Sequence, residues 1–430
     1  MFEKFYQLKA NGTNVKTEVL AGITTFLTMA YILAVNPNIL SAAGMDKSAL
    51  FTATAVASIV GTLAMALLAK LPFAQAPGMG MNAFFAFTVV LGMGYSWQFA
   101  LTAILIEGLA FFVMNVFNVR EAIVNAIPNT LKSAISAGIG LFIAFIGLQS
   151  AGIVVNDDAT LVKMGNITEG AALLGLLGLV ITSVLLILKV KGALLLGILG
   201  TAILGIPMGI TSFTGIVDAP PDPTPLFFKF DFSQIFTWDM LIVVFTFLFV
   251  DVFDTVGTLI GVCSKANMLD AKGQIPNAKK AFYSDAIGTT AGAIFGTSAV
   301  TTYVESAAGV SEGGRTGLTA LVTAGCFALA LFFAPLFLSI PGAATAPVLI
   351  LVGLMMLSPI KDIDLSDYSE SIPAFICIIA MPLMYSIAEG ISLGLLAYVL
   401  LNLIGKNQKK ISIAMYILAI LFVLNYIFVQ

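Results

Sequence analysis

The sequence predicts an all-α polytopic membrane protein, in which fourteen segments form two inverted repeats of seven and an extra apolar helix follows at the C-terminus. Three observations predict this fold. The 430-residue chain is 59% hydrophobic and only 10% charged, which is too apolar for a soluble globular protein. Its basic residues are concentrated in alternate loops. Short strings of residues also recur in the same order in the two halves.

Apolar stretches of about 15–24 residues set the positions of the segments. A further apolar run at 411–429 predicts either a fifteenth span or an interfacial helix, and no cleavable signal peptide is expected. The fourteen segments lie at about 19–35, 49–69, 74–91, 98–118, 133–152, 171–189, 193–210, 239–262, 281–296, 297–310, 316–339, 344–358, 371–386 and 389–404.

The loops between these segments orient the chain. With the N-terminus in the cytoplasm, seventeen of the twenty lysines and arginines, Arg120 and Lys272 among them, fall on the cytoplasmic side. The two long loops on the other side are acidic instead. We therefore expect a multi-pass protein of the cell (plasma) membrane with a cytoplasmic N-terminus and the lipid bilayer as its surroundings.

The two halves resemble each other. The string at 25–27 (Thr-Phe-Leu) recurs at 246–248, and the string at 101–103 (Leu-Thr-Ala) recurs at 318–320. Seven segments per repeat is an odd number, so the halves insert with opposite orientation. Inverted repeats of this kind are typical of secondary transporters.

Segments 3 and 10 occupy equivalent places in the repeats, and both are poor continuous helices. Pro77 and nearby glycines interrupt the first, and a Thr/Ser/Val run at 297–304 interrupts the second. Irregular backbone at membrane depth is tolerated where it is buried in protein or lines a cavity. We expect two short extended breaks near the midplane, with Asn82 and Glu305 beside them. The alternative is that the small residues only permit close helix packing.

Acidic side chains inside apolar segments are the candidates for function. Asp251 and Asp254 lie on segment 8, and a carboxylate at the bilayer centre costs at least about 2.5–3.5 kcal/mol on insertion scales. Because histidine is absent, a proton carrier must be Asp or Glu, and the candidates are Glu305, Asp254 and Asp251. The alternative for segment 8 is a structural salt bridge with Arg315 or Lys132.

Other polar residues have plainer interpretations. For Asp285 we favour structural hydrogen bonding, and for Glu312 with Arg315 a cap or gate pair. The three cysteines are widely spaced in apolar contexts, so neither a disulfide framework nor a metal site is predicted, and no cofactor is expected.

Two carboxyl groups, an amide and an aromatic face suit a flat, uncharged ring with hydrogen-bonding edges, such as a nucleobase. One of the acids could take up a proton with the substrate and release it on the other side, because burial disfavours the charged form. This chemistry predicts symport by coupled protonation.

Four long motifs in order, at 24–37, 76–87, 249–258 and 297–309, resemble those of the purine permeases of the AzgA-like branch. These belong to the nucleobase–cation symporters of the uracil-permease fold. The resemblance implies proton-coupled import of hypoxanthine, guanine or adenine by an elevator mechanism, and a homodimer formed through a gate domain. It places Asp254 and Glu305 at the carboxylates that meet the base, and Asn82 at the segment 3 strand that binds it.

The resemblance also implies a division into domains. Segments 1–4 and 8–11 form a core domain, and segments 5–7 and 12–14 form the gate domain. In this chain the core comprises 1–120 and 216–340, the gate comprises 121–215 and 341–405, and 406–430 is the extra helix.

The residues and the resemblance together give the candidate site. Uracil-type relatives have histidine one turn after the segment 8 acid, where this chain has Thr258. That difference fits a purine branch but removes a candidate proton partner. The cavity-lining candidates are Thr25, Thr28 and Thr302, and the substrate-binding candidates are Asn82, Ala83, Phe84, Asp254, Thr258, Val304 and Glu305.

Other functions fit the sequence less well. An intramembrane aspartyl protease would need Gly-x-Gly-Asp around one aspartate, which is absent, and we predict no enzyme activity and no nucleic-acid partner. An anion transporter on the same fold would favour a basic or neutral residue where this chain has Glu305. Uracil or xanthine remains an alternative substrate, and the sequence leaves open the preferred purine and the choice between proton and sodium.

Overall fold

The computed structural model describes residues 2–117, 127–265, 268, 275 and 277–428. Arg120, Lys272 and the predicted domain boundary at 120/121 lie outside the described residues. Within them, each of the fourteen predicted segments corresponds to a helix or to a strand followed by a helix, which confirms the predicted fold class. Eight of the described helices are long and apolar enough to cross a membrane.

In the first half the chain forms short helix α1 (Phe2–Tyr6) and then seven segments. The third is the strand β1 with helix α5, which continues as a π-helix at Phe84–Gly92. The long elements are α2 (Val15–Met29) with α3 (Ile32–Ser41), α4 (Lys47–Ala64), β1 (Gln75–Pro77) with α5 (Met79–Ala83), α6 (Trp97–Val116), α8 (Asn129–Ser150), α9 (Gly170–Ile187) and α10 (Ala193–Gly205).

The second half repeats this order, with β4 and α13 in place of β1 and α5. Its elements are α11 (Trp238–Lys265), α12 (Ala278–Phe295), β4 (Val300–Thr302) with α13 (Ser306–Ser311), α14 (Gly317–Ala330) with α15 (Ala334–Leu338), α16 (Gly342–Leu357), α17 (Tyr368–Leu383) and α18 (Ile387–Ile404).

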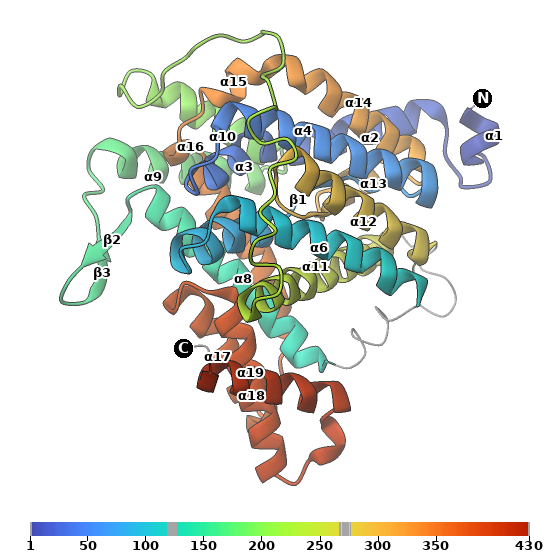
Figure 1. Cartoon of the computed structure of the whole chain (residues 1–430). Coiled ribbons are helices and arrows are strands. Elements are labelled where there is room, and N and C mark those ends of the chain that lie inside the picture. Colours follow the sequence, from blue (N-terminus) through green and yellow to red (C-terminus); the bar gives the residue numbers. More distant parts are fainter. Residues whose placement is uncertain (1, 118–126, 266–267, 269–274, 276, 429–430) are drawn as a thin grey trace.

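The helices pack in two groups (Figure 1). In one group, α12 packs on α4 and α6, and α14 packs on α2 and α4. In the other, α16 packs on α8 and α9, and α17 packs on α8 and α18. The two groups draw on both halves of the sequence, so each half contributes helices to each group.

The two predicted breaks meet as a pair of antiparallel strands. β1 pairs with β4 in the register Gln75↔Thr302, Ala76↔Thr301 and Pro77↔Val300. The bond from Gly78 N to Ala299 O, at 2.9 Å, continues the pairing past its end. Each strand therefore finds backbone partners in the other half of the chain.

A threonine closes the outer edge of each strand. Thr62 on α4 accepts from Gln75 N at 3.0 Å and donates to Gln75 O at 3.0 Å. Thr289 on α12 accepts from Val300 N at 3.2 Å and donates to Val300 O at 3.0 Å. The two threonines play the same part in opposite repeats, which is the pseudo-symmetry of the fold at the level of single hydroxyl groups.

A glycine precedes each of these threonines, and the two glycines meet where α4 crosses α12. A Cβ added at Gly288 would lie 3.2 Å from the Cα of Gly61 and 2.8 Å from a methyl group of Val300. Small residues at both positions let the two helices approach closely enough to enclose the strand pair.

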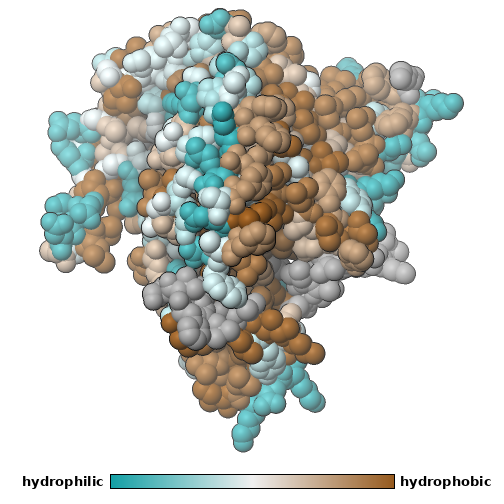
Figure 2. Space-filling view, viewed as in Figure 1, coloured by the Kyte–Doolittle hydropathy of each residue, from teal (hydrophilic) through white to brown (hydrophobic). Residues whose placement is uncertain are grey.

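Two connections add to the duplicated framework. A hairpin of β2 (Val154–Asp157) and β3 (Leu161–Met164), which the sequence did not predict, projects between α8 and α9. The segment at 211–237 crosses the helices without regular structure, and Figure 2 shows a polar stripe there between apolar surfaces. It is fixed at Pro221 O, which accepts from Thr52 Oγ1 at 2.8 Å, and at Phe228 N, which donates to Ile294 O at 2.8 Å.

The C-terminal run forms α19 (Ile413–Phe428), which packs against α18. Tyr426, near its end, lies 2.6 Å from Ser392 and hydrogen-bonds Glu389 in the first turns of α18. The two helices are therefore antiparallel along the length of α18, and the choice between a fifteenth span and an interfacial helix stays a prediction.

We expect Thr289→Val to lower the melting temperature of the purified protein in detergent by several degrees. The substitution leaves a buried N–H and C=O of Val300 without their partner, at about 1–3 kcal/mol for each unmet group. Thr290→Val is the matched control, because among the described residues the Thr290 hydroxyl bonds to Ala286 O alone, one turn back in its own helix. Equal melting temperatures for the two variants would contradict this role of Thr289.

Candidate functional site

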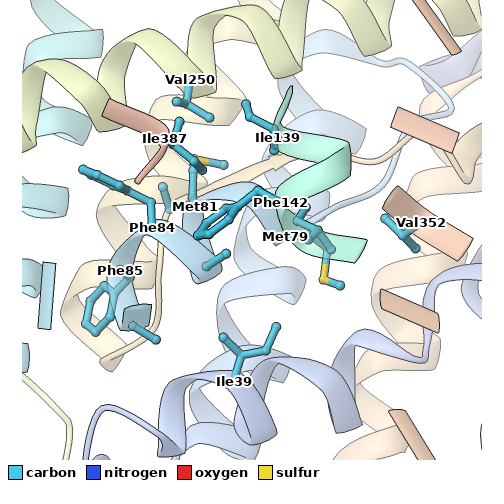
Figure 3. Close-up of a cluster of buried hydrophobic side chains, with 14 of the residues drawn as sticks. Ile39, Met79, Met81, Phe84, Phe85, Ile139, Phe142, Val250, Val352 and Ile387 are labelled. Atoms are coloured by element: carbon cyan, nitrogen blue, oxygen red, sulfur yellow. The ribbon is translucent and has the colours of Figure 1, made fainter. Parts of the chain in front are cut away.

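The strand pair positions the candidate residues between the two helix groups. β1 leads into α5, which carries Asn82, and β4 leads through Glu305 into α13. Figure 3 shows the apolar surroundings of α5, where Met79 and Met81 lie in one cluster with Ile139 and Phe142 of α8. A Cβ added at Gly80 would lie 2.9 Å from a methyl group of Ile139. The first turn of α5 is therefore one of the places where the two helix groups meet.

Glu305 is held by residues of the first segment. Its Oε1 accepts a hydrogen bond from the Tyr31 hydroxyl at 2.6 Å, and its backbone oxygen lies 3.4 Å from Thr28 Oγ1. Tyr31 is buried, whereas Glu305 is half-buried and its neighbour Val304 is 50% exposed. The carboxyl group therefore has a fixed donor on one side and an accessible surface beside it.

Asp254 lies at the junction of β1 and α5. Its Oδ2 would lie 3.8 Å from a Cβ added at Gly78, and its charge interacts with those of Glu305 and Asp285. Within the described part of the chain no residue donates a hydrogen bond to its side chain, and the residue is half-buried. Asp254 thus has unmet hydrogen-bonding capacity close to Glu305.

Asn82 is buried next to the strand pair. Its Oδ1 accepts a hydrogen bond from the Ser298 hydroxyl, and its Nδ2 has no partner in the described structure. A buried amide donor without a partner is costly unless another group occupies the position. The Asn82 side chain is therefore prepared to donate to a third group.

A buried polar network lies behind these residues. Thr255 Oγ1 donates to Asp285 Oδ2 at 2.7 Å, lies 2.7 Å from Thr301 Oγ1 and is 3.3 Å from Asp251 Oδ1. Gln75 Nε2 donates to Asp285 Oδ1 at 3.1 Å. Asp285 is thus hydrogen-bonded through both carboxylate oxygens, as we expected for a structural residue.

The Thr255 hydroxyl connects two acids of this network. A hydroxyl has a single proton and here three oxygen neighbours, so it cannot donate to all of them at once. A proton on Asp251 would donate toward Thr255, whose own proton already serves Asp285. A role of Asp251 in proton transfer stays a prediction.

Several predicted residues lie in packed positions. The ring of Phe84 is 1% exposed and contacts Phe247 edge to face, so it offers no open stacking surface in this structure. Thr25 is buried where α2 meets α13 at Gly309, and Thr302 accepts from Gln75 at 3.3 Å. Ala83 is buried as well, and Thr258 is half-buried one turn after Asp254. Their contacts with a substrate stay predictions.

The basic residues considered as partners for segment 8 are engaged elsewhere. Arg315 donates to Val310 O and Gly314 O, both at 2.7 Å, and Lys132 donates to Asn129 at 3.2 Å. The expected pair of Glu312 with Arg315 is wrong, because Glu312 forms an ion pair with Lys191 at 2.7 Å. Sequence proximity suggested the first pairing, whereas the fold brings the loop before α10 to Glu312.

Sequence reasoning passed over Gln75 and Ser298, which hold Asp285 and Asn82. The two lie 223 positions apart, the same separation as Asn82 and Glu305. Applying the repeat offset to every polar residue of segment 3 would have identified them.

Comparisons with known proteins agree with this architecture. The sequence matches the Permease family over residues 16–393. It is 43% identical over 430 residues to adenine permease AdeP of Escherichia coli K12, covering 100% of this chain and 97% of AdeP. It is 43% identical over 425 residues to guanine/hypoxanthine permease PbuO of Bacillus subtilis 168, covering 97% of this chain and 98% of PbuO.

Among solved structures, the transmembrane domain of the cyanobacterium bicarbonate transporter BicA is similar, with a TM-score of 0.66. The likeness covers 87% of this chain and 97% of that one at 17% sequence identity. At this identity it shows the fold alone.

We expect Thr255→Val to destabilise the protein by about 1–3 kcal/mol, because it removes a buried donor from Asp285 and a contact of Thr301. Thr255→Ser keeps the hydroxyl group and should retain most of the stability. Thermal unfolding of both variants in detergent measures the difference. If the valine variant unfolds at the wild-type temperature, the network does not depend on Thr255.

Proposed function

This chain belongs to the Permease family, and we propose that it imports purine nucleobases together with protons, with hypoxanthine and guanine as substrates and adenine as a further one. Members of this family are membrane transporters, not enzymes. The adenine permease and the guanine/hypoxanthine permease that align along nearly the whole chain support a purine substrate. The observation that carries the proposal is the convergence of Asp254, Glu305 and Asn82 beside one strand pair.

The chemistry of these three groups suits a purine. Carboxylates accept N–H groups, an amide offers both a donor and an acceptor, and the ring edges of purines present matching sets. Asp254 and the Nδ2 group of Asn82 have no hydrogen-bond partner among the described residues. An uncharged base would satisfy them without adding charge, whereas an anion would meet two acidic side chains. That contrast disfavours the anion alternative, and uracil or xanthine remains the alternative within the nucleobases.

Proton coupling rests on the acids. The chain has no histidine, and its proton-carrier candidates are Glu305 and Asp254 at the proposed substrate position and Asp251 in the buried network behind them. Two carboxyl groups whose charges repel each other favour a state in which one is protonated. Substrate and proton would then enter together and leave together, as symport requires.

Movement of one helix group relative to the other would give alternating access. We propose that α2–α6 and α11–α14 form the core domain, that α8–α10 and α16–α18 form the gate domain, and that the core moves as an elevator. One contact between the groups is the ion pair of Lys191 with Glu312. Because exposed ion pairs contribute only about 0–1 kcal/mol, this one is weak enough to open in each cycle.

The surroundings of the protein complete the proposal. We place the chain in the cell membrane with a cytoplasmic N-terminus, on the distribution of basic residues. We also propose a homodimer formed through the gate domain, as the family resemblance implies.

Uptake of radiolabelled hypoxanthine into cells that lack purine permeases tests the function. We expect unlabelled guanine and hypoxanthine to compete strongly and adenine to compete measurably, and a protonophore to reduce uptake. Cells carrying the empty vector are the control. Uptake that requires sodium and ignores the protonophore would contradict proton coupling, and failure of every purine to compete would contradict the substrate class.

We expect Glu305→Gln and Asp254→Asn to abolish this uptake while the protein still reaches the membrane, because each removes a carboxyl group from the site without changing its shape. Glu169→Gln, an exposed acid in a loop, is the matched control and should transport at the wild-type rate. Uptake is compared after normalising to the amount of protein in the membrane. Wild-type rates for both site variants would exclude these acids from the mechanism.

A further inference from the structure

A cavity lies away from the proposed transport site, on the face that the basic residues assign to the cytoplasm. It has a volume of about 540 Å³, within the range of about 300–1,000 Å³ that is usual for small-molecule sites. The residues at 5–11, the turn after α4 and the turn between α13 and α14 form its walls. None of the residues proposed to bind substrate lines it.

The lining is cationic. Among the described residues that line the cavity, Lys70 and Arg315 are basic and none is acidic. Lys70 Nζ donates one hydrogen bond to Phe5 O at 3.1 Å and lies 4.1 Å from the centroid of the Phe5 ring. Arg315 uses Nη1 for both of its carbonyl acceptors, so its Nε and Nη2 groups bond to none of the described residues. Both cations therefore keep donors for a ligand.

A buried hydroxyl group adds a third donor. Tyr6 lines the cavity and is 4% exposed, yet its hydroxyl oxygen has no hydrogen-bond partner in the described structure. Burial raises the pKa of the Tyr6 phenol, so the group stays protonated and able to donate. Tyr6, Lys70 and Arg315 line the same cavity, so one hydrogen-bond acceptor bound there would complete this set of donors.

The buried carboxylate of Glu18 does not serve as an acceptor for these donors. Glu18 accepts from Arg315 N at 2.9 Å, from Thr319 N at 3.0 Å and from Thr319 Oγ1 at 2.6 Å. Its carboxylate caps the start of α14 and is committed to backbone groups there. The guanidinium of Arg315 is left to the cavity and to the two carbonyl groups that orient it.

We propose that this cavity binds a phosphate group, carried either by a free phosphate compound of the cytoplasm or by the headgroup of an anionic phospholipid. Arginine and lysine are the side chains that recognise phosphate, the first through its planar set of donors and the second as a point charge. The volume leaves room for the group to which the phosphate is attached. The site is independent of the proposed substrate, and only its assignment to the cytoplasmic side relies on the orientation proposed above.

The test measures binding to the purified full-length protein and needs no transport. Inorganic phosphate and adenosine monophosphate are titrated against the protein in non-ionic detergent, with sodium chloride matched for ionic strength, and the melting temperature is followed. In a second arm, the protein in nanodiscs of neutral lipid is compared with the protein in nanodiscs that contain an anionic phospholipid. Stabilisation in the first arm identifies a soluble ligand, and stabilisation in the second arm alone identifies a lipid.

Variants of the cavity decide whether the binding occurs there. We expect Lys70→Gln to weaken binding at least about tenfold and Tyr6→Phe about fivefold, as the loss of a charged and of a neutral hydrogen bond predicts. Lys280→Gln, an exposed lysine of α12 outside the cavity, should bind like the wild type. Lys70→Gln is preferred to Arg315→Gln because the Arg315 guanidinium also holds the turn after α13.

The proposal is overturned if the phosphate compounds stabilise the protein no more than sodium chloride does and the anionic phospholipid stabilises it no more than neutral lipid does. It is also overturned if the stabilisation is unchanged in both Lys70→Gln and Tyr6→Phe. The binding test does not measure transport, and purine uptake by Lys70→Gln and Tyr6→Phe is measured separately. Failure of this proposal is therefore distinguishable from failure of the proposed function.

Discussion

Hydrocarbon offers no hydrogen bonds, so any backbone that leaves the helical path inside a membrane must find its partners in the protein. The antiparallel pair of β1 and β4 meets this requirement. The two strands satisfy each other on their inner edges, and the hydroxyl groups of Thr62 and Thr289 satisfy Gln75 and Val300 on the outer edges. Once the backbone is paired in this way, α5 and α13 can begin in the interior of the molecule, and the side chains at their starts can face a shared position.

Hydroxyl groups contact three of the acids at or behind the candidate site, namely Glu305, Asp285 and Asp251. Tyr31 binds Glu305, and Thr255 binds Asp285 and lies near Asp251. A hydroxyl group can donate to a carboxylate and can accept from a carboxylic acid, so it tolerates both protonation states. A lysine or arginine partner would stabilise only the charged form. Acids held in this way are suited to gaining and losing protons, which is the behaviour that the proposed symport needs.

The pattern of the sequence predicts the fold closely, and the site only in part. Hydropathy locates the segments, and Pro77 and the Thr/Ser/Val run locate the two breaks, because these features act locally. The pairing of Gln75 with Thr302 joins residues 227 positions apart, and no local signal reports its register. The burial of Phe84 against Phe247 and the pairing of Glu312 with Lys191 likewise depend on which helices become neighbours. For such contacts the repeat offset is the most useful guide, since it relates Gln75 to Ser298 and Asn82 to Glu305.

The strand pair also bears on how the chain is made. When the ribosome has delivered the first seven segments to the translocon, β1 is complete, but its partner at 300–302 has not yet been synthesised. Until then the inner edge of β1 has unmet polar groups at membrane depth, so the early segments cannot reach their final arrangement. Assembly of the interior must wait for the second half. A gene encoding one half alone would produce a polypeptide with an open strand edge, unless a second copy supplied the missing partner.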